Sequence, residues 1–176
     1  WILPSMPLLK PSRISASSSQ RPVDRQNLVL VRPMKSAKLS SSLTRRLEKA
    51  ARRAAKSSYS PYSKFPVGAA VYSSSGRIFT GCNVENASYG LCNCAERTAL
   101  FTAVAEGERA IDAVVVYTAT TVASSPCGAC RQVINEFGPN AIVICLCDTD
   151  DRIESRLEKL LPAAFGPGNL RGPDPA

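Results

Sequence analysis

Residues 81–100 read GCNVENASYGLCNCAERTAL, and residues 125–137 read SPCGACRQVINEF. The first stretch holds Cys94 with Glu96 two residues later, and the second holds Cys127 and Cys130 behind a proline. The chain contains no histidine, so a transition-metal site in it must use sulfur. Three cysteines occupy three of the four tetrahedral positions of Zn2+ and leave the fourth for a water, which is the arrangement of a catalytic zinc site.

The spacing explains how the three sulfurs can meet. Cys127 and Cys130 lie three residues apart, so both sulfurs can face one point from the first turn of a helix. Cys94 opens a second helical run, and two helix N-termini directed at one metal favour thiolates over thiols. Three thiolates on Zn2+ leave one net negative charge, which Arg97, and also Arg131, are placed to offset from behind the ligands.

Glu96 is the candidate proton carrier. A carboxylate beside the metal can take a proton from water and deliver it to a substrate nitrogen. Plainer interpretations exist: Cys127 and Cys130 could be a redox pair, Glu96 a solvated helix residue, and Cys92 a fourth ligand that would make the zinc structural. Cys94-x-Glu96 followed by Pro-Cys-x-x-Cys matches the signature of the zinc deaminases that act on nucleobases, so catalysis is favoured.

The composition is that of one globular domain. The chain has 176 residues, of which 44% are hydrophobic and 20% charged, and its apolar runs fall short of the roughly 20 residues that span a bilayer. Its seven cysteines all lie from Cys82 onward. An odd number of cysteines argues against a disulfide scaffold and favours a reducing compartment, the cytoplasm.

The formal net charge of +8 belongs to one end of the chain. Residues 1–46 carry nine Lys and Arg and one acidic residue, whereas residues 47–176 carry thirteen of each sign. We predict a disordered basic segment, rich in Ser and Pro, over residues 1–38 and a catalytic domain over residues 39–176. The segment also fits an organelle transit peptide, a start at Met34, or a basic RNA-binding arm, the last disfavoured because aromatic residues do not interleave with its charges.

The apolar patterns predict alternating helices and strands. A helix is expected from an N-cap at Ser41 or Ser42 to about Lys56. Further helices begin at Cys94 and after Cys127, and strands are expected at residues 67–72, 77–83, 113–118, 142–146 and 152–156. The first two strands form an antiparallel hairpin, and strands linked by helices are expected to run parallel. The pattern predicts an α/β fold with a mixed sheet covered by helices.

Five short motifs follow one another along the chain: FPVGAA from Phe65, GCNVEN from Gly81, CAER from Cys94, SPCGACRQ from Ser125 and LPAAFGP from Leu161. Together they resemble the small homotetrameric cytidine deaminases over about residues 43–170. The resemblance implies a three-layer α/β/α sandwich around a five-stranded mixed sheet. It also implies hydrolytic deamination of cytidine and deoxycytidine in pyrimidine salvage, with one Zn2+ per subunit held by Cys94, Cys127 and Cys130, and with Glu96 as proton donor and acceptor.

The resemblance assigns substrate-binding residues as well. Asn83 and Glu85 would hold the ribose 3′-hydroxyl, and Phe65 would flank the base. Three positions would reach the active site of a neighbouring subunit, so that activity requires the tetramer: Ala87, Tyr89 and Phe165. Without the other motifs, Asn83 and Glu85 would be interpreted as turn residues that cap a strand, and Phe165 as an anchor for the C-terminal segment.

Other substrates would share this core. Deaminases of cytosine in RNA or DNA carry the same metal motif, but they need a basic channel beside the zinc, and residues 47–176 have no net charge. A related aminopyrimidine nucleoside such as blasticidin would leave the core unchanged, whereas a catalytically dead zinc scaffold would lack Glu96. We expect a small nucleoside as the partner, with no nucleic acid and no membrane.

Overall fold

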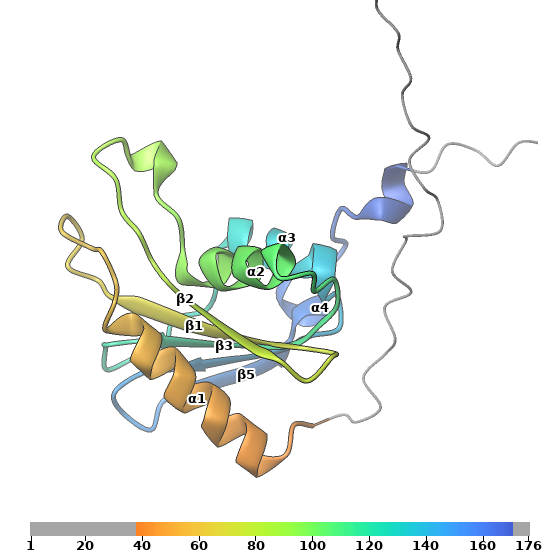
Figure 1. The fold of residues 1–176 in the computed structure, drawn as a ribbon, viewed down its shortest axis with the longest axis horizontal. Coiled ribbons are helices and arrows are strands. Elements are labelled where there is room, and N and C mark those ends of the chain that lie inside the picture. The colour runs from red at the N-terminus through yellow and green to blue at the C-terminus, as the bar shows by residue number, and fades with distance from the viewer. Residues whose placement is uncertain (1–37, 171–176) are drawn as a thin grey trace, which may run out of the picture.

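Three layers make up the fold, with helices on both faces of one sheet (Figure 1). The structure is a computed structural model that describes residues 38–170. The strand order is β2-β1-β3-β4-β5, and the strands are β1 (Val67–Ser73), β2 (Ile78–Cys82), β3 (Ile111–Thr118), β4 (Ile142–Leu146) and β5 (Arg152–Arg156). Strands β3 and β4 pair parallel, and the other neighbouring strands pair antiparallel. The predicted mixed sheet is confirmed. The strands linked by helices also run in the same direction as predicted, because β2 and β3 are both antiparallel to β1, which lies between them, and β3 pairs parallel with β4.

One helix covers one face of the sheet, and the helices that carry the cysteines cover the other (Figure 1). The helices are α1 (Ser41–Ala55), α2 (Ala95–Ala105), α3 (Gly128–Phe137) and the short α4 (Leu157–Leu160), with single 3-10 turns η2 (Tyr89–Leu91) and η3 (Pro167–Leu170). The α1 layer lies on the sheet face opposite to α2 and α3, which gives the α/β/α sandwich that the sequence predicted.

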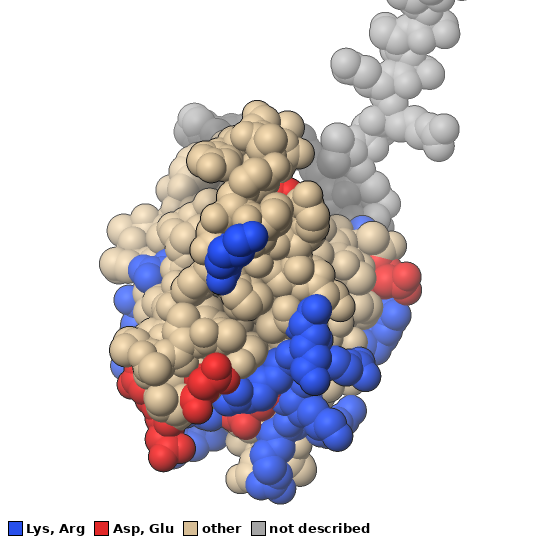
Figure 2. All heavy atoms as spheres, turned by 90° about the vertical axis from the view of Figure 1, so that its left-hand side faces the viewer, with Lys and Arg blue, Asp and Glu red and all other residues tan. Residues whose placement is uncertain are grey.

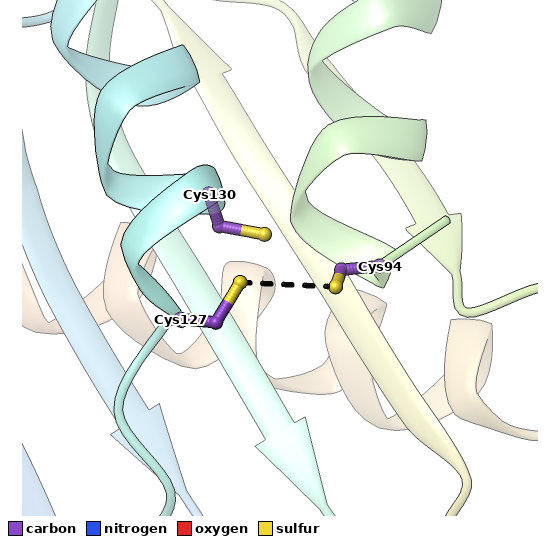
Figure 3. Close-up of side chains that lie close together, drawn as sticks. All are labelled: Cys94, Cys127 and Cys130. Carbon is purple, nitrogen blue, oxygen red and sulfur yellow. Dashed lines mark hydrogen bonds between the residues drawn. The ribbon is translucent and has the colours of Figure 1, made fainter. Parts of the chain in front are cut away.

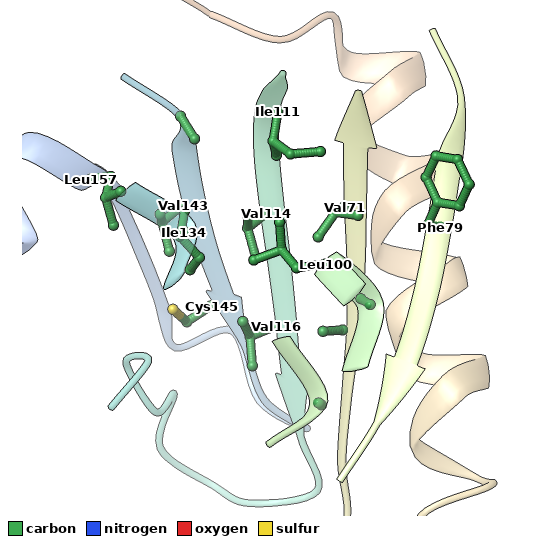
Figure 4. Packing of buried hydrophobic residues seen from close by; sticks show 14 of the residues in the cluster. Val71, Phe79, Leu100, Ile111, Val114, Val116, Ile134, Val143, Cys145 and Leu157 are labelled. Carbon is green, nitrogen blue, oxygen red and sulfur yellow. The ribbon is translucent and has the colours of Figure 1, made fainter. Parts of the chain in front are cut away.

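Alternation along β3 separates two cores. Val114 and Val116 point into the core beneath α2 and α3, together with Val143 and Cys145 of β4 (Figure 4). Val115, the intervening residue, packs toward α1 with the other cluster. Both faces of the central strands are therefore buried, and each such side chain contributes about 1.5–3 kcal/mol of transfer free energy.

The N-cap of α1 is Ser40, and the prediction of Ser41 or Ser42 was wrong. Ser40 has extended backbone angles, its Oγ accepts a hydrogen bond from the Leu43 amide at 3.2 Å, and its carbonyl oxygen accepts one from the Thr44 amide at 2.9 Å. Neighbouring serines are equivalent as caps, so tertiary packing decides between them. Here Leu43 packs against the core of the α1 face, which requires the helix to be formed before that residue.

Basic side chains gather on one side of the surface (Figure 2). Arg46, Lys49 and Arg53 of α1 line a shallow groove beside Ile78 and Thr80 of the edge strand β2. These cations belong to the α1 layer, across the sheet from α2 and α3.

Residues 38–170 contain no helix long and apolar enough to cross a membrane. Residues 1–37 lie outside the described part of the chain. The interpretations of residues 1–38 as a disordered segment, a transit peptide or an RNA-binding arm therefore stay predictions.

Close approach between α1 and β1 depends on Gly68. A Cβ atom at this position would lie 2.1 Å from the Ala51 carbonyl oxygen and 2.4 Å from the Ala55 nitrogen. Both atoms belong to the α1 backbone, which cannot move aside without shifting the whole helix. A side chain at residue 68 would therefore push α1 off the sheet.

Replacing Gly68 by alanine tests this packing. We expect Gly68→Ala to lower the free energy of unfolding by about 1–3 kcal/mol through overpacking, measured by denaturant and thermal unfolding. Gly168→Ala is the matched control, because a Cβ at Gly168 meets no atom within 4 Å. Equal stability of the Gly68→Ala protein and the wild type would show that α1 does not pack this closely on β1.

Candidate active site

Two helix N-termini bring three thiols together (Figure 3). Cys94 is the N-cap residue of α2, Cys127 is the N-cap residue of α3, and Cys130 lies in the first turn of α3. Their three Sγ atoms all lie within 4.8 Å of one another, and those of Cys94 and Cys127 are 4.0 Å apart. Neither N-cap cysteine uses its side chain to cap the helix amides, so both sulfurs are available as ligands.

The sulfur cluster fits Zn2+. Zinc–sulfur bonds of about 2.3 Å in a tetrahedron place two sulfurs about 3.8 Å apart, close to the separation of Cys94 and Cys127. Within residues 38–170 no other group of three or more Cys, Asp or Glu side chains is arranged to hold a metal. Cys92 is not part of this group, and its Sγ accepts a hydrogen bond from the Asn86 amide at 3.3 Å. The arrangement is therefore a three-sulfur site with room for a fourth, non-protein ligand.

Arg97 lies beside the cluster. Its Nη2 is 3.5 Å from Cys94 Sγ and 3.2 Å from the Cys92 carbonyl oxygen. A hydrogen bond from the Cys130 thiol, and after it the Arg97 guanidinium, lower the pKa of Cys94 to about 5. The hydrogen bond to Cys94 and burial raise the pKa of Cys130. Arg131, the other cation expected to offset the thiolate charge, directs its nitrogens to backbone and hydroxyl oxygens instead.

Glu96 sits in the first turn of α2 and is only 5% exposed. Burial raises the pKa of its carboxyl above the usual range, against hydrogen bonds from its own amide and from the Cys130 thiol. Burial thus favours the protonated form, and a carboxyl can act in catalysis both as proton donor and as proton acceptor.

Cys94 and Glu96 both line a cavity of about 370 Å³, within the size range of small-molecule sites. Its wall includes three residues expected from the sequence, Phe65, Asn83 and Glu85. No Lys or Arg occurs among the described residues that line it.

Asn83 and Glu85 both hold the loop that precedes β1. Asn83 Oδ1 accepts from the Val67 amide at 2.8 Å, and its Nδ2 donates to the Phe65 carbonyl oxygen at 2.9 Å. The Glu85 carboxylate accepts from the Tyr62 amide at 2.9 Å, from the Ser63 amide at 3.2 Å and from the Ser63 hydroxyl. The Ser63 hydroxyl bond is the largest cause that lowers the pKa of Glu85. Both side chains thus have a structural task besides any contact with substrate.

The remaining expected residues do not line this chain's own cavity. Ala87 is exposed in the loop before η2, Tyr89 is 72% exposed, and Phe165 is 57% exposed. Tyr89 lies against Tyr62, with ring centroids 5.8 Å apart, in a second groove that shares Ser63 and Glu85 with the cavity.

Sequence reasoning missed several cavity residues. Ser63, Ser124 and Ser125 bring hydroxyl groups to the wall, and Thr118 lines it from the end of β3. Ser125 immediately precedes the Pro-Cys-x-x-Cys motif. Its position two residues before a metal ligand could have predicted that it lies in the site. The other three come from loops and a strand end whose closeness depends on the fold.

Three thiols lie beside a buried carboxyl, next to a cavity whose described lining contains no Lys or Arg. This arrangement defines a zinc hydrolase site of the deaminase type. A sequence model of the "Cytidine and deoxycytidylate deaminase zinc-binding region" matches residues 41–146. The chain belongs to this cytidine and deoxycytidylate deaminase family.

Individual relatives agree with this assignment. A cytidine deaminase of Sporosarcina psychrophila is 48% identical over 120 residues, which are 68% of this chain and 88% of that protein. A probable cytidine deaminase of Dictyostelium discoideum is 47% identical over 113 residues, 62% of this chain and 75% of that protein. The crystal structure of cytidine deaminase from Burkholderia pseudomallei has a TM-score of 0.67 and 47% identity, and covers 72% of this chain and 100% of its own. The resemblance, the fold and the zinc cofactor expected from the sequence are confirmed.

Metal analysis of cysteine variants tests the ligand set. We expect one zinc per wild-type chain by elemental analysis, and a loss of most of it in Cys94→Ser, Cys127→Ser and Cys130→Ser, because each change removes one of three sulfur ligands. Cys92→Ser is the matched control and should retain zinc, since its sulfur bonds to Asn86. Loss of zinc from Cys92→Ser as well would indicate a four-sulfur structural site.

Proposed function

We propose that the chain catalyses the zinc-dependent hydrolysis of cytidine and deoxycytidine to uridine and deoxyuridine, with release of ammonia. The observation that carries this is the joint position of Glu96 and the sulfur cluster. Glu96 and Cys94 face one cavity, and the other two sulfurs lie within 4.8 Å of Cys94 Sγ. This is the constellation that hydrolytic removal of an exocyclic amine requires.

Cys94, Cys127 and Cys130 would hold Zn2+, which would supply Lewis-acid activation of water at neutral pH. The Glu96 carboxylate takes a proton from the water that adds to C4 of the pyrimidine and delivers it to N3. It then moves a proton to the departing amine, so that ammonia rather than an amide anion leaves. Arg97, in contact with Cys94, offsets the negative charge of the thiolates from behind the ligand.

The nucleoside itself would be held by neutral contacts and one carboxylate. Phe65, which is 39% exposed and lines the cavity, offers a ring face to the base. Asn83 and Glu85 would bind the ribose 3′-hydroxyl. A carboxylate has about four acceptor sites, so Glu85 can accept a sugar hydroxyl while it still holds the loop at Ser63.

The charge of the cavity favours a nucleoside over a nucleotide. A 5′-phosphate would need cationic partners, and the described lining contains none while it includes Glu85 and Glu96. The basic side chains of α1 lie across the sheet, so they do not form a channel beside the zinc. Both facts argue against deamination of a nucleotide or of cytosine in RNA or DNA.

A homotetramer with shared active sites accounts for the residues left outside the cavity. Ala87, Tyr89 and Phe165 would complete the site of a neighbouring subunit. Their exposure on a single chain supports this role, because exposed side chains are free to contact a neighbouring subunit, and Tyr89 lies in a groove that shares Ser63 and Glu85 with the cavity.

The setting that we propose is pyrimidine salvage in the cytoplasm, with residues 39–176 as the deaminase domain. All seven cysteines, which lie within the described residues, are free thiols. Free thiols, three of them metal ligands, fit a reducing compartment. Residues 1–38 would form a separate basic segment.

Turnover of a panel of substrates tests the reaction. We expect the full-length chain to convert cytidine and deoxycytidine, followed by the change in near-UV absorbance, but not CMP or a cytosine-containing oligonucleotide. Glu96→Ala should lower kcat by about 10²–10⁴-fold or more while the zinc content stays at one per chain, because only the proton carrier is lost.

Two results would overturn this proposal. Conversion of the oligonucleotide alone would identify a polynucleotide deaminase, and a Glu96→Ala protein that retains both zinc and full activity would remove the mechanism. Blasticidin is included as a fourth substrate, and preference for it over cytidine would change the assigned nucleoside.

Co-expression of two defective chains tests the shared sites. We expect Phe165→Ala and Glu96→Ala each to be impaired alone, and mixed oligomers to recover activity, with about a quarter of the sites intact after random assortment in a closed oligomer. Size-exclusion chromatography of the wild type should show a tetramer. No recovery in oligomers shown to be mixed would place Phe165 outside any partner's site.

A further inference from the structure

Arg131 makes hydrogen bonds in three directions with three different nitrogens. Nε donates to the Pro126 carbonyl oxygen at 2.8 Å, Nη1 to the Leu160 carbonyl oxygen at 2.8 Å, and Nη2 to Ser125 Oγ at 2.7 Å. Within residues 38–170 no carboxylate forms an ion pair with it. A half-buried guanidinium that bonds only to neutral oxygens gains little from its charge. What matters for these contacts is the fixed planar arrangement of its N–H donors.

The residues that Arg131 holds lead directly to a metal ligand. Ser125 and Pro126 are the two residues before Cys127, whose extended backbone opens α3. The loop that enters this segment has a second anchor farther back, where the Ala123 amide donates to Asp151 Oδ2 at 2.8 Å. Two of the three Arg131 bonds thus fix the two residues directly before Cys127. They therefore set the direction from which the Cys127 sulfur approaches the cluster.

The bond to Ser125 also determines whether the Ser125 hydroxyl can act as a hydrogen-bond donor in the cavity. Ser125 lines the cavity, and its Oγ accepts from Arg131 Nη2. Among residues 38–170 no second hydrogen bond of this hydroxyl is found. A hydroxyl has one donor and two acceptor sites, so the Ser125 proton stays available to an acceptor in the cavity.

The third bond ties the same guanidinium to the C-terminal segment. Leu160 ends α4, and farther along the segment the Phe165 carbonyl oxygen accepts from Gln132 Nε2 at 2.8 Å and from Asn135 Nδ2 at 3.3 Å. The helix that carries two of the three sulfurs therefore holds the cavity loop on one side and the C-terminal segment on the other. Arg131 is the residue that touches both.

We propose that Arg131 is a positioning residue, whose fork fixes Ser125 and the approach of Cys127 to the metal and links both to the C-terminal segment. The proposal rests on the proposed function for its effect on turnover, and on the metal site alone for its effect on zinc. Geometry rather than charge is the operative property. A lysine would keep the charge but cannot place three donors in a plane.

Arg131→Lys and Arg131→Gln separate the two properties. In both variants of the full-length chain we expect kcat for cytidine to fall about 10–100-fold, and the release of zinc to a chelator to speed up by a similar factor, as for other groups that support metal ligands. KM should change less than kcat does, since the residues proposed to contact the sugar and base, Phe65, Asn83 and Glu85, are not bonded to Arg131. Arg109→Lys is the matched control, because Arg109 also donates to two backbone carbonyls, those of Val104 and Glu108, far from the metal in the fold.

A double-mutant cycle of Arg131 and Ser125 tests whether the loss of kcat comes from the hydrogen bond between them. Ser125→Ala removes one of the three bonds and leaves the carbonyl bonds, so it should lower kcat less than Arg131→Gln does. The two changes combined should cost less than the product of their separate effects, because they remove a shared interaction. Strict multiplication of the two effects would contradict the proposal.

The remaining outcomes are decisive as well. Wild-type kcat and zinc release in Arg131→Lys would show that charge suffices and would overturn the proposal. If the Arg131 variants fail to fold, an unchanged kcat in the folded Ser125→Ala protein would overturn it too. A wild-type chain that is inert toward cytidine, but in which Arg131→Lys still loses zinc faster than Arg109→Lys, would refute the proposed function and support the positioning role.

Discussion

The meeting of three sulfurs between two helix N-termini constrains the rest of the structure. Cys94 comes from α2, whereas Cys127 and Cys130 come from α3, so both helices must lie on the same face of the sheet with their N-termini adjacent. The parallel pair β3 and β4, joined through α3, places that helix over the sheet. Gly81 admits α2 against β2, because a Cβ there would lie 2.3 Å from the Ala99 nitrogen. Sheet topology and one missing side chain thus set the metal geometry.

The site gathers groups that a folded core otherwise avoids. Glu96 is a buried carboxyl, and Cys94 is a partly buried thiol whose lowered pKa favours the thiolate. Burying such groups costs free energy unless a partner compensates. Bound zinc is that partner, because a metal that binds the folded site and not the unfolded chain adds its binding free energy to stability. The cofactor needed for chemistry is therefore also expected to stabilise the layers that hold it.

The parts of the fold and site that the sequence predicted are those encoded by local spacing. Cys127 and Cys130 are three residues apart, and Glu96 follows Cys94 by two, so short motifs specify their arrangement. What could not be predicted depends on long-range contacts. Nothing in the motif indicates that Arg131 bonds to Leu160, 29 residues away. The sequence patterns likewise predicted strand directions but not that β3 lies beside β1, because strand order is decided by long-range packing.

A single chain leaves the two ends of its cavity in different states. The metal end is lined by Cys94 and by the buried Glu96. Another part of the wall belongs to the loop that Glu85 holds, and the exposed ring of Tyr89 lies in the adjoining groove. The groups proposed for the chemistry are thus buried, whereas those proposed to retain the substrate belong to surface segments, which a neighbouring subunit would cover in the proposed tetramer. Because α3 reaches both the cluster and the segment of Phe165, a shift of this helix would alter the metal ligands and the C-terminal segment together.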